Sequence, residues 1–109
     1  MPLVYKILGQ SAPAATTEAD LYTVPASTST IVSSMSIANR GTAAATYRIS
    51  TSAAGGATAT KDYVVYDANI NPNQTVVLTL GVTLATTDKI RVYASTADLS
   101  FQAYGTQVS

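Results

Sequence analysis

The segment of residues 21–41, LYTVPASTSTIVSSMSIANRG, limits the fold of this chain more than any other stretch. In residues 30–39 apolar and small polar side chains recur at every second position. The alternate side chains Ile31, Ser33, Met35 and Ile37 are expected to share the buried face of a strand. A period of two with β-branched residues is typical of a strand that is buried on one side. Pro25 has no amide proton for a sheet ladder, and the Asn39-Arg40-Gly41 sequence tolerates a turn. The segment therefore predicts a strand, a turn, a second strand and a second turn.

The same alternation recurs along the rest of the chain. It predicts strands at residues 4–10, 21–24, 30–39, 44–52, 62–70, 75–84, 90–94 and from residue 99 onward. The inward-facing sets expected on the later strands are Ala45, Tyr47 and Ile49; Val76, Leu78, Leu80, Val82 and Leu84; Ile90, Val92 and Ala94; and Leu99, Phe101 and Ala103. Gly81 interrupts the sixth strand, which predicts a bulge or a bend where the strand leaves its sheet.

The spacing of these strands indicates the fold class. Strands roughly 8–14 residues apart, without a convincing helix between them, are typical of antiparallel sandwiches and barrels. We therefore predict an all-β chain that forms a single antiparallel β-sandwich of about eight strands, either jelly-roll or immunoglobulin-like. We expect one domain over residues 1–109, with an N-terminal strand and arm-like loop in residues 1–20 and the sandwich body in residues 21–109. The glycine-rich segment of residues 51–62 is expected to be an exposed loop.

The composition carries the first functional clue. Charged residues make up 11% of the chain, against about 25% in an average soluble domain, and the formal net charge is zero. A net charge near zero favours association. Two interpretations stay open: much of the surface lies against other subunits, or the chain is a secreted or surface domain kept in solution by its hydroxyl groups.

Several classes of chemistry are excluded or disfavoured. The chain has no cysteine and no histidine, which excludes thiol nucleophiles, disulfides and imidazole-based catalysis or metal binding. No pair of acidic residues has a spacing that indicates catalysis, so we expect no enzyme, no catalytic residue and no cofactor. Asp62, Asp67 and Asn69 could share an edge as oxygen ligands for calcium, but turn polarity explains them as well. We therefore expect no metal site.

Nucleic acids and membranes are also not expected as partners. The six basic residues are scattered and are matched by six acidic ones, which argues against nucleic-acid binding. No apolar stretch approaches the roughly 20 residues that a membrane helix needs. The N-terminal MPLVYKILGQ lacks a basic leader and a long apolar run, so no signal peptide is expected.

Seven tyrosines and no tryptophan are present. Five of these tyrosines fall within predicted strands: Tyr47, Tyr63, Tyr66, Tyr93 and Tyr104. An outward-facing tyrosine can stack on a sugar or pack in a protein interface with its hydroxyl left to hydrogen bond. The predicted loop tips consist mostly of Ala, Gly, Ser and Thr, which favours packing over sugar binding. A glycan ligand stays open as the less favoured alternative.

Several motifs carry a family resemblance that extends from about residue 4 to residue 108. They are LYTVP, the NRG turn before ATYR, the YDANINPNQT turn, LTLGVTL, DKIRVYAST and LSF. With these motifs the chain resembles small β-sandwich virion structural proteins of tailed bacteriophages, many of them from cyanophages and other marine phages. The resemblance implies a capsid decoration or cement protein that binds the major capsid protein as a homotrimer, on the outer capsid surface of a virion made in the host cytoplasm. The alternative is a receptor- or carbohydrate-binding module on the neck, tail or head fibre.

The expected contact residues come from the N-terminal part of the chain and from the last two predicted strands. Residues 2–7 and 12–20 are apolar or small enough to lie on a neighbouring subunit. Four side chains on the last two strands are outward-facing by alternation and are candidates for a subunit interface. The candidate interface residues are Pro2, Leu3, Val4, Tyr5, Pro13, Thr16, Thr17, Arg91, Tyr93, Gln102 and Tyr104.

Overall fold

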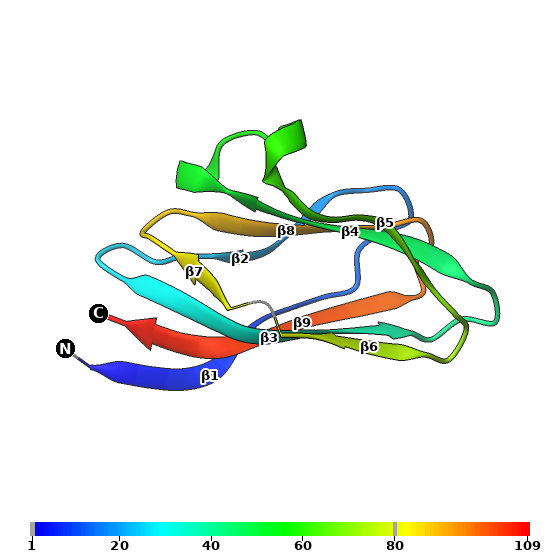
Figure 1. Ribbon diagram of the computed structural model, residues 1–109, viewed down its shortest axis with the longest axis horizontal. Coiled ribbons are helices and arrows are strands. Elements are labelled where there is room, and N and C mark those ends of the chain that lie inside the picture. The colour runs from blue at the N-terminus through cyan, green and yellow to red at the C-terminus, as the bar shows by residue number, and fades with distance from the viewer. Residues whose placement is uncertain (1, 80) are drawn as a thin grey trace.

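The computed structural model describes residues 2–79 and 81–109, and these form nine strands and two short 3₁₀ turns in two stacked sheets (Figure 1). The elements are β1 (Leu3–Ser11), β2 (Ala19–Thr23), β3 (Ser29–Asn39), β4 (Ala45–Ser52), η1 (Ala53–Gly55), η2 (Thr60–Asp62), β5 (Tyr63–Ile70), β6 (Thr75–Leu78), β7 (Val82–Leu84), β8 (Lys89–Ala94) and β9 (Leu99–Val108). One sheet has the order β1-β9-β3-β6, with β7 also on β3, and the other has the order β2-β8-β4-β5.

The strand pairing is that of one long hairpin folded over on itself. β1 pairs with β9, β2 with β8, β3 with β6 and β7, and β4 with β5, all antiparallel. Successive strand pairs of the folded hairpin lie in alternate sheets, and this nested order defines a jelly roll. The predicted all-β sandwich is confirmed, and the strand order separates the jelly roll from the immunoglobulin-like alternative.

The prediction that residues 75–84 form one continuous strand is wrong. The segment is divided into β6 and β7, and Gly81 between them has a φ of 60°. The strand does not leave its sheet at this point, because β6 and β7 both pair with β3. Leu80, which was expected to face the core, lies outside the described residues.

The core lies between the two sheets. Its largest fully buried side chains are Phe101, Met35, Ile37, Ile49, Ile70, Ile90, Leu99, Val24, Val32 and Val92. The inward-facing sets predicted on β4, β8 and β9 are all buried. At about 25 cal/mol per Å² of apolar surface removed from water, this layer is the main source of stability.

Two of the residues predicted to face inward on β3, Ile31 and Ser33, are instead exposed. The register between β3 and β9 shifts between Val32 and Ser34, which leaves Ser33 as an extra residue in a bulge. The extra residue reverses the alternation, so that Thr30 and Val32 are buried on one side of the bulge and Met35 and Ile37 on the other. Ile31 is therefore on the outside of the sheet.

A second bulge lies on the other side of β9. The register between β1 and β9 shifts between Ile7 and Gly9, which leaves Leu8 as the extra residue. Gly105 of β9 lies beside both irregularities, and a Cβ atom on it would come within 2.1 Å of the backbone oxygen of Ile31. Glycine is required here because the bulged backbone of β3 approaches β9 so closely.

A buried polar bridge joins the two sheets near the chain termini. The hydroxyls of Tyr22 in β2 and Thr30 in β3 are 2.8 Å apart, and Nε2 of Gln107 in β9 donates to the Tyr22 hydroxyl at 2.7 Å. The buried hydroxyls of Tyr22 and Thr30 are thereby satisfied, which offsets the cost of burying them.

The Ser50→Ala variant is expected to be more stable than the wild type. Ser50 pairs with Arg91 and shares its face of the sheet, but it is buried beneath the loop that Arg91 holds. Its Oγ has no hydrogen-bond partner in the described part of the chain. Removing this unsatisfied hydroxyl should raise the free energy of unfolding by about 1 kcal/mol, measured by urea denaturation.

The control is Ser52→Ala, because the Ser52 hydroxyl accepts a hydrogen bond from Arg91 at 3.0 Å. This variant should lose about 1 kcal/mol. Equal destabilisation of both variants would contradict the assignment of Ser50 as unsatisfied.

The Gly105→Ala variant is expected to lose about 2 kcal/mol or more of unfolding free energy, because the added methyl group would overlap the backbone of β3. Gly56→Ala is the matched control, since its Cβ would meet only one atom, at 3.6 Å. The control should change stability by less than about 0.5 kcal/mol. Thermal unfolding followed by circular dichroism measures both, and a fully stable Gly105→Ala variant would contradict the close approach.

Candidate functional site

Among the described residues, no strand position that faces outward from the β1-β9-β3-β6 sheet carries a charge. Two basic side chains border this face: Lys6 of the edge strand β1, and Arg40 beyond β3, which donates to the Ser100 hydroxyl at 2.8 Å. Residues that pair directly across strands share a face, so the register assigns the outward set. This set is Leu3, Tyr5, Ile7 and Gln10 on β1; Ser100, Gln102, Tyr104, Thr106 and Val108 on β9; Ser29, Ile31, Ser34, Ser36 and Ala38 on β3; Thr75 and Val77 on β6; and Thr83 on β7. We call this surface the neutral face.

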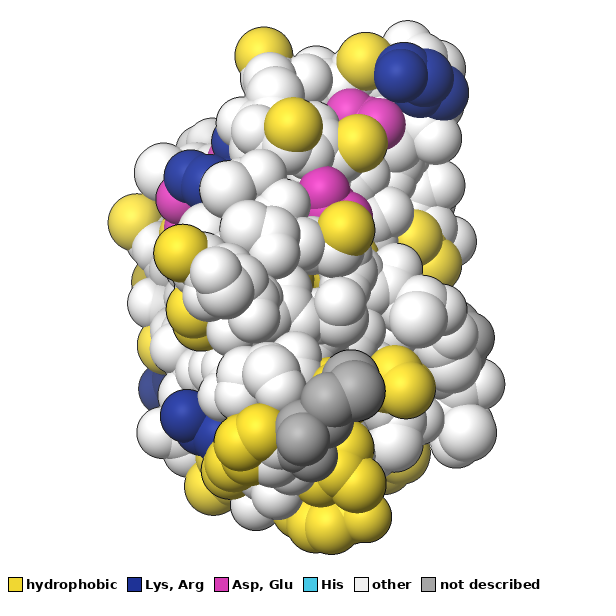
Figure 2. Space-filling view, turned by 90° about the vertical axis from the view of Figure 1, so that its left-hand side faces the viewer, with side chains coloured by type: hydrophobic (Ala, Val, Ile, Leu, Met, Phe, Trp, Pro, Cys, Tyr) yellow, Lys and Arg dark blue, Asp and Glu magenta, His cyan; other side chains and the backbone are white. Residues whose placement is uncertain are grey.

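One end of the neutral face is apolar. Tyr5, Thr106, Ile31 and Thr83 form a single row across four strands. Tyr5 is 77% exposed and Ile31 is 46% exposed, and Leu3 and Ile7 beside them are also exposed. Figure 2 looks at the end of the molecule where both termini lie, and hydrophobic side chains gather along its lower edge, where β1 runs. Exposed apolar side chains that adjoin one another are typical of an interaction surface.

A shallow hollow of about 450 Å³ lies within this apolar end. Its lining residues are Tyr5, Lys6, Ile7, Ser33, Tyr104, Gly105 and Thr106. Both the bulged Ser33 and the required Gly105 border it, so the irregular register of β3 and β9 shapes the surface.

The rest of the neutral face is polar but uncharged. The Tyr104 hydroxyl donates to Oε1 of Gln102 at 2.7 Å and lies 3.1 Å from the Ser36 hydroxyl. Ser33 donates to the backbone oxygen of Tyr104 at 3.1 Å. These bonds hold the side chains in place, which lowers the entropy cost of ordering them against a partner.

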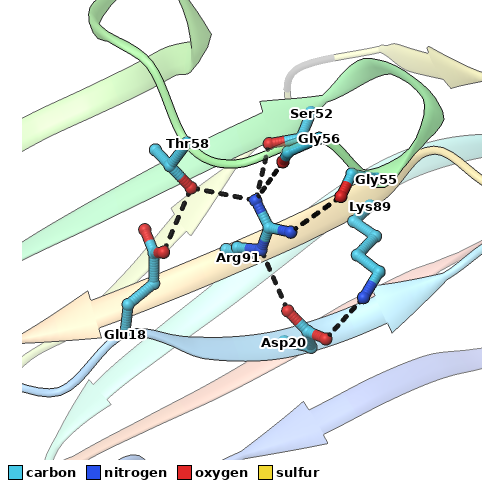
Figure 3. Close-up of polar contacts among 8 residues, drawn as sticks. All are labelled: Glu18, Asp20, Ser52, Gly55, Gly56, Thr58, Lys89 and Arg91. Atoms are coloured by element: carbon cyan, nitrogen blue, oxygen red, sulfur yellow. Dashed lines mark hydrogen bonds and ion pairs between the residues drawn. The ribbon is translucent and has the colours of Figure 1, made fainter.

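The outer face of the opposite sheet carries charged side chains, and Asp20 pairs there with Lys89 and Arg91 (Figure 3). Arg91 of β8 donates to Asp20 at 3.0 Å and to the backbone oxygens of Gly55 and Gly56 at 3.1 and 2.6 Å. It also donates to the hydroxyls of Ser52 and Thr58, each at 3.0 Å. Arg91 therefore anchors the glycine-rich loop to the sheet. The loop is exposed, as predicted, but it is held at its base.

Arg48 of β4 lies between two aromatic rings on the same face. Its guanidinium carbon is 4.4 Å from the ring centres of both Tyr66 and Tyr93. Two of its nitrogens donate to Asp67, at 2.7 and 3.3 Å. The hydrogen bond to Asp67 raises the pKa of Arg48 above its ordinary value. Sequence analysis did not find this stack, because β5 carries its own bulge where Tyr66 and Asp67 both lie opposite Arg48.

The candidate interface residues are divided between the two outer faces. Gln102 and Tyr104 lie on the neutral face, whereas Arg91 and Tyr93 lie on the charged face of the other sheet. The last two strands therefore do not present one common surface. An interface role for each of these residues stays a prediction.

The N-terminal candidates are also separated. Leu3, Val4 and Tyr5 are exposed on β1, next to the exposed Pro2. β1 is an edge strand that pairs with β9 along its length. In the loop before β2, Pro13 is buried, and Thr16 and Thr17 are exposed. The Thr16 amide donates to the Ala94 oxygen at 2.8 Å, which fixes this loop against β8.

Two solved structures share this fold over nearly the whole chain. One is "Structure of infectious bursal disease virus Gx strain", with 10% sequence identity and a TM-score of 0.56 over 97% of this chain. The other is "Structure of infectious bursal disease virus Gt strain", with 10% identity and a TM-score of 0.51 over 96% of this chain. This chain spans 31% of the length of each. At this identity the likeness establishes the fold: a jelly-roll sandwich shared with chains of a virus structure.

No family model and no curated protein matches the sequence. Among residues 2–79 and 81–109 no helix is long and apolar enough to span a membrane. In the same residues no three His, Cys, Asp or Glu side chains lie together as metal ligands. Of the three residues considered for calcium, Asp62 accepts from the Ala59 amide, Asp67 from Arg48, and Asn69 donates to Asn71.

The Asp20→Asn variant is expected to lose stability at neutral pH, and this loss should shrink progressively as the pH falls below 3.8. Hydrogen bonding to Lys89, and then to Arg91, lowers the pKa of Asp20 below its ordinary 3.8. The contribution of Asp20 to stability is therefore complete when the pH lies above the unfolded-state pKa. It disappears as the pH falls through the folded-state pKa. Asp20 is half exposed, so the loss at neutral pH should be about 0.5 kcal/mol. Urea denaturation across this pH range measures it, and an equal loss at all pH values would contradict the linkage.

Proposed function

We propose that this chain is a virion structural protein that decorates a phage capsid and cements the lattice of its major capsid protein. The observation that carries the proposal is the neutral face, whose apolar end exposes Leu3, Tyr5, Ile7 and Ile31. The jelly-roll fold, shared with chains of a virus structure, and the resemblance to phage virion proteins support the same function.

The distribution of charge selects the neutral face as the contact surface. Each ion pair found among the described residues lies on the opposite sheet, where Arg48 pairs with Asp67 and Asp20 with Lys89 and Arg91. Covering charged side chains requires their desolvation, whereas covering apolar and hydroxyl side chains costs much less. A partner with an apolar, uncharged surface is therefore favoured at the neutral face.

A cementing protein acts through mass action and copy number. A ligand that binds only the assembled lattice stabilises that lattice, and the stabilisation grows with the free concentration of the ligand relative to its Kd. A homotrimer at a three-fold position would contact several capsid subunits at once, and linked contacts bind more tightly than one contact alone. The low charge of the chain is compatible with such an assembled state.

The Ile31→Asp variant tests the proposed function. In solution the wild-type protein should have three times the mass of one chain by light scattering. It should also co-sediment with phage heads that lack it and raise their melting temperature. A charge at Ile31 should weaken binding to heads at least tenfold, since a desolvated aspartate within the contact costs about 1.4 kcal/mol or more.

Val64→Asp is the matched control. Val64 is 42% exposed on β5 of the other sheet, close to the 46% of Ile31, so the same change in charge occurs outside the neutral face. This control should bind heads like the wild type. A monomer that ignores heads, or equal loss of binding in both variants, would overturn the proposal.

A further inference from the structure

We propose a second binding site on the opposite sheet, at Tyr63 and Tyr66 of β5, that takes a neutral sugar residue of a glycan. This site is separate from the neutral face and does not depend on the cementing function. The loop tips alone disfavour sugar binding, but the structure combines the loop with two tyrosines from a neighbouring strand.

The site is an open hollow of about 630 Å³ between the glycine-rich loop and β5. Its lining residues are Thr58, Ala59, Thr60, Tyr63 and Tyr66. The volume lies within the range of about 300–1,000 Å³ found for small-molecule sites. The loop wall is fixed, because Arg91 donates to Thr58 and Asp62 accepts from the Ala59 amide at 2.9 Å.

The aromatic wall is exposed and yet held in position. Tyr66 is 59% exposed. Its ring meets that of Tyr63 edge to face, with the centroids 4.8 Å apart, and the Arg48 guanidinium packs against it. Asp67 and Tyr93 hold Arg48 in turn. A large aromatic side chain that is ordered before binding contributes contact area at little entropy cost.

The chemistry of the lining selects a neutral ligand with both apolar and hydroxyl surfaces. The charge of Arg48 is neutralised by Asp67, and the five lining residues carry none. The hydroxyls of Thr60, Tyr63 and Tyr66 make no hydrogen bond to any other described residue, so they can bond to a ligand. A pyranose ring presents an apolar C–H face to an aromatic ring and hydroxyls at its edge, which matches this combination.

The experiment titrates the purified full chain with the methyl glycosides of glucose, galactose, mannose and N-acetylglucosamine. NMR reports shifts of assigned tyrosine resonances, and tyrosine fluorescence is directly observable because the chain has no tryptophan. At least one glycoside should give saturable shifts at Tyr63 and Tyr66, with a Kd of about 1 mM. The affinity should not change with salt, because no charge is matched on binding.

Three variants distinguish the site from other effects. Tyr66→Ala should weaken binding at least tenfold, whereas Tyr66→Phe keeps the ring and should stay within about threefold of the wild type. Tyr5→Ala removes a tyrosine of the neutral face that is even more exposed than Tyr66, and it should leave sugar binding unchanged. The dispersion of the remaining NMR signals reports that each variant is folded.

Two results would overturn the proposal. One is the absence of saturable shifts with all four glycosides, and the other is a shift that persists in the Tyr66→Ala variant. The cementing test has a separate outcome: Ile31→Asp should lose binding to heads and keep its affinity for the glycoside.

Discussion

The close approach of β3 and β9 at Gly105 is the constraint on which the neutral face depends. A side chain at this position would overlap the backbone of Ile31, and both neighbours of β9 carry a bulge beside it. The bulge at Ser33 reverses the alternation of β3, which turns Ile31 outward into the same row as Tyr5. Without the bulge, Ile31 would join the core and the row would lose its central apolar residue.

The two sheets divide the properties of the surface between them. The β2-β8-β4-β5 sheet carries the ion pairs, and the Arg91 guanidinium contacts both the glycine-rich loop and Asp20. The β1-β9-β3-β6 sheet offers hydroxyl, amide and apolar side chains on its outer face. A jelly roll buries only one face of each sheet, so the composition of the outer faces is free to serve contacts. The two proposals use these outer faces separately: the neutral face for a protein partner and the tyrosine-lined hollow for a smaller ligand.

Sequence reasoning succeeded where strands are regular. On β8, Ile90, Val92 and Ala94 are buried as predicted, because nothing interrupts their alternation. It was wrong at Ile31, since a bulge depends on how closely a neighbouring strand approaches and leaves no periodic signal. It also grouped Arg91 and Tyr93 with Gln102 and Tyr104, because adjacency in sequence does not show that β8 and β9 belong to different sheets.

The sequence by itself determined the class of this protein. Period-two alternation, turn residues and the absence of cysteine and histidine were enough for a β-sandwich without thiol or imidazole chemistry. Only the tertiary structure decided the jelly-roll order, the segregation of charge onto one sheet, and the stack of Arg48 between Tyr66 and Tyr93. The physical reason is that alternation is a local property of one strand. A face, a groove or a stack forms between strands that are distant in sequence and are brought together by backbone pairing.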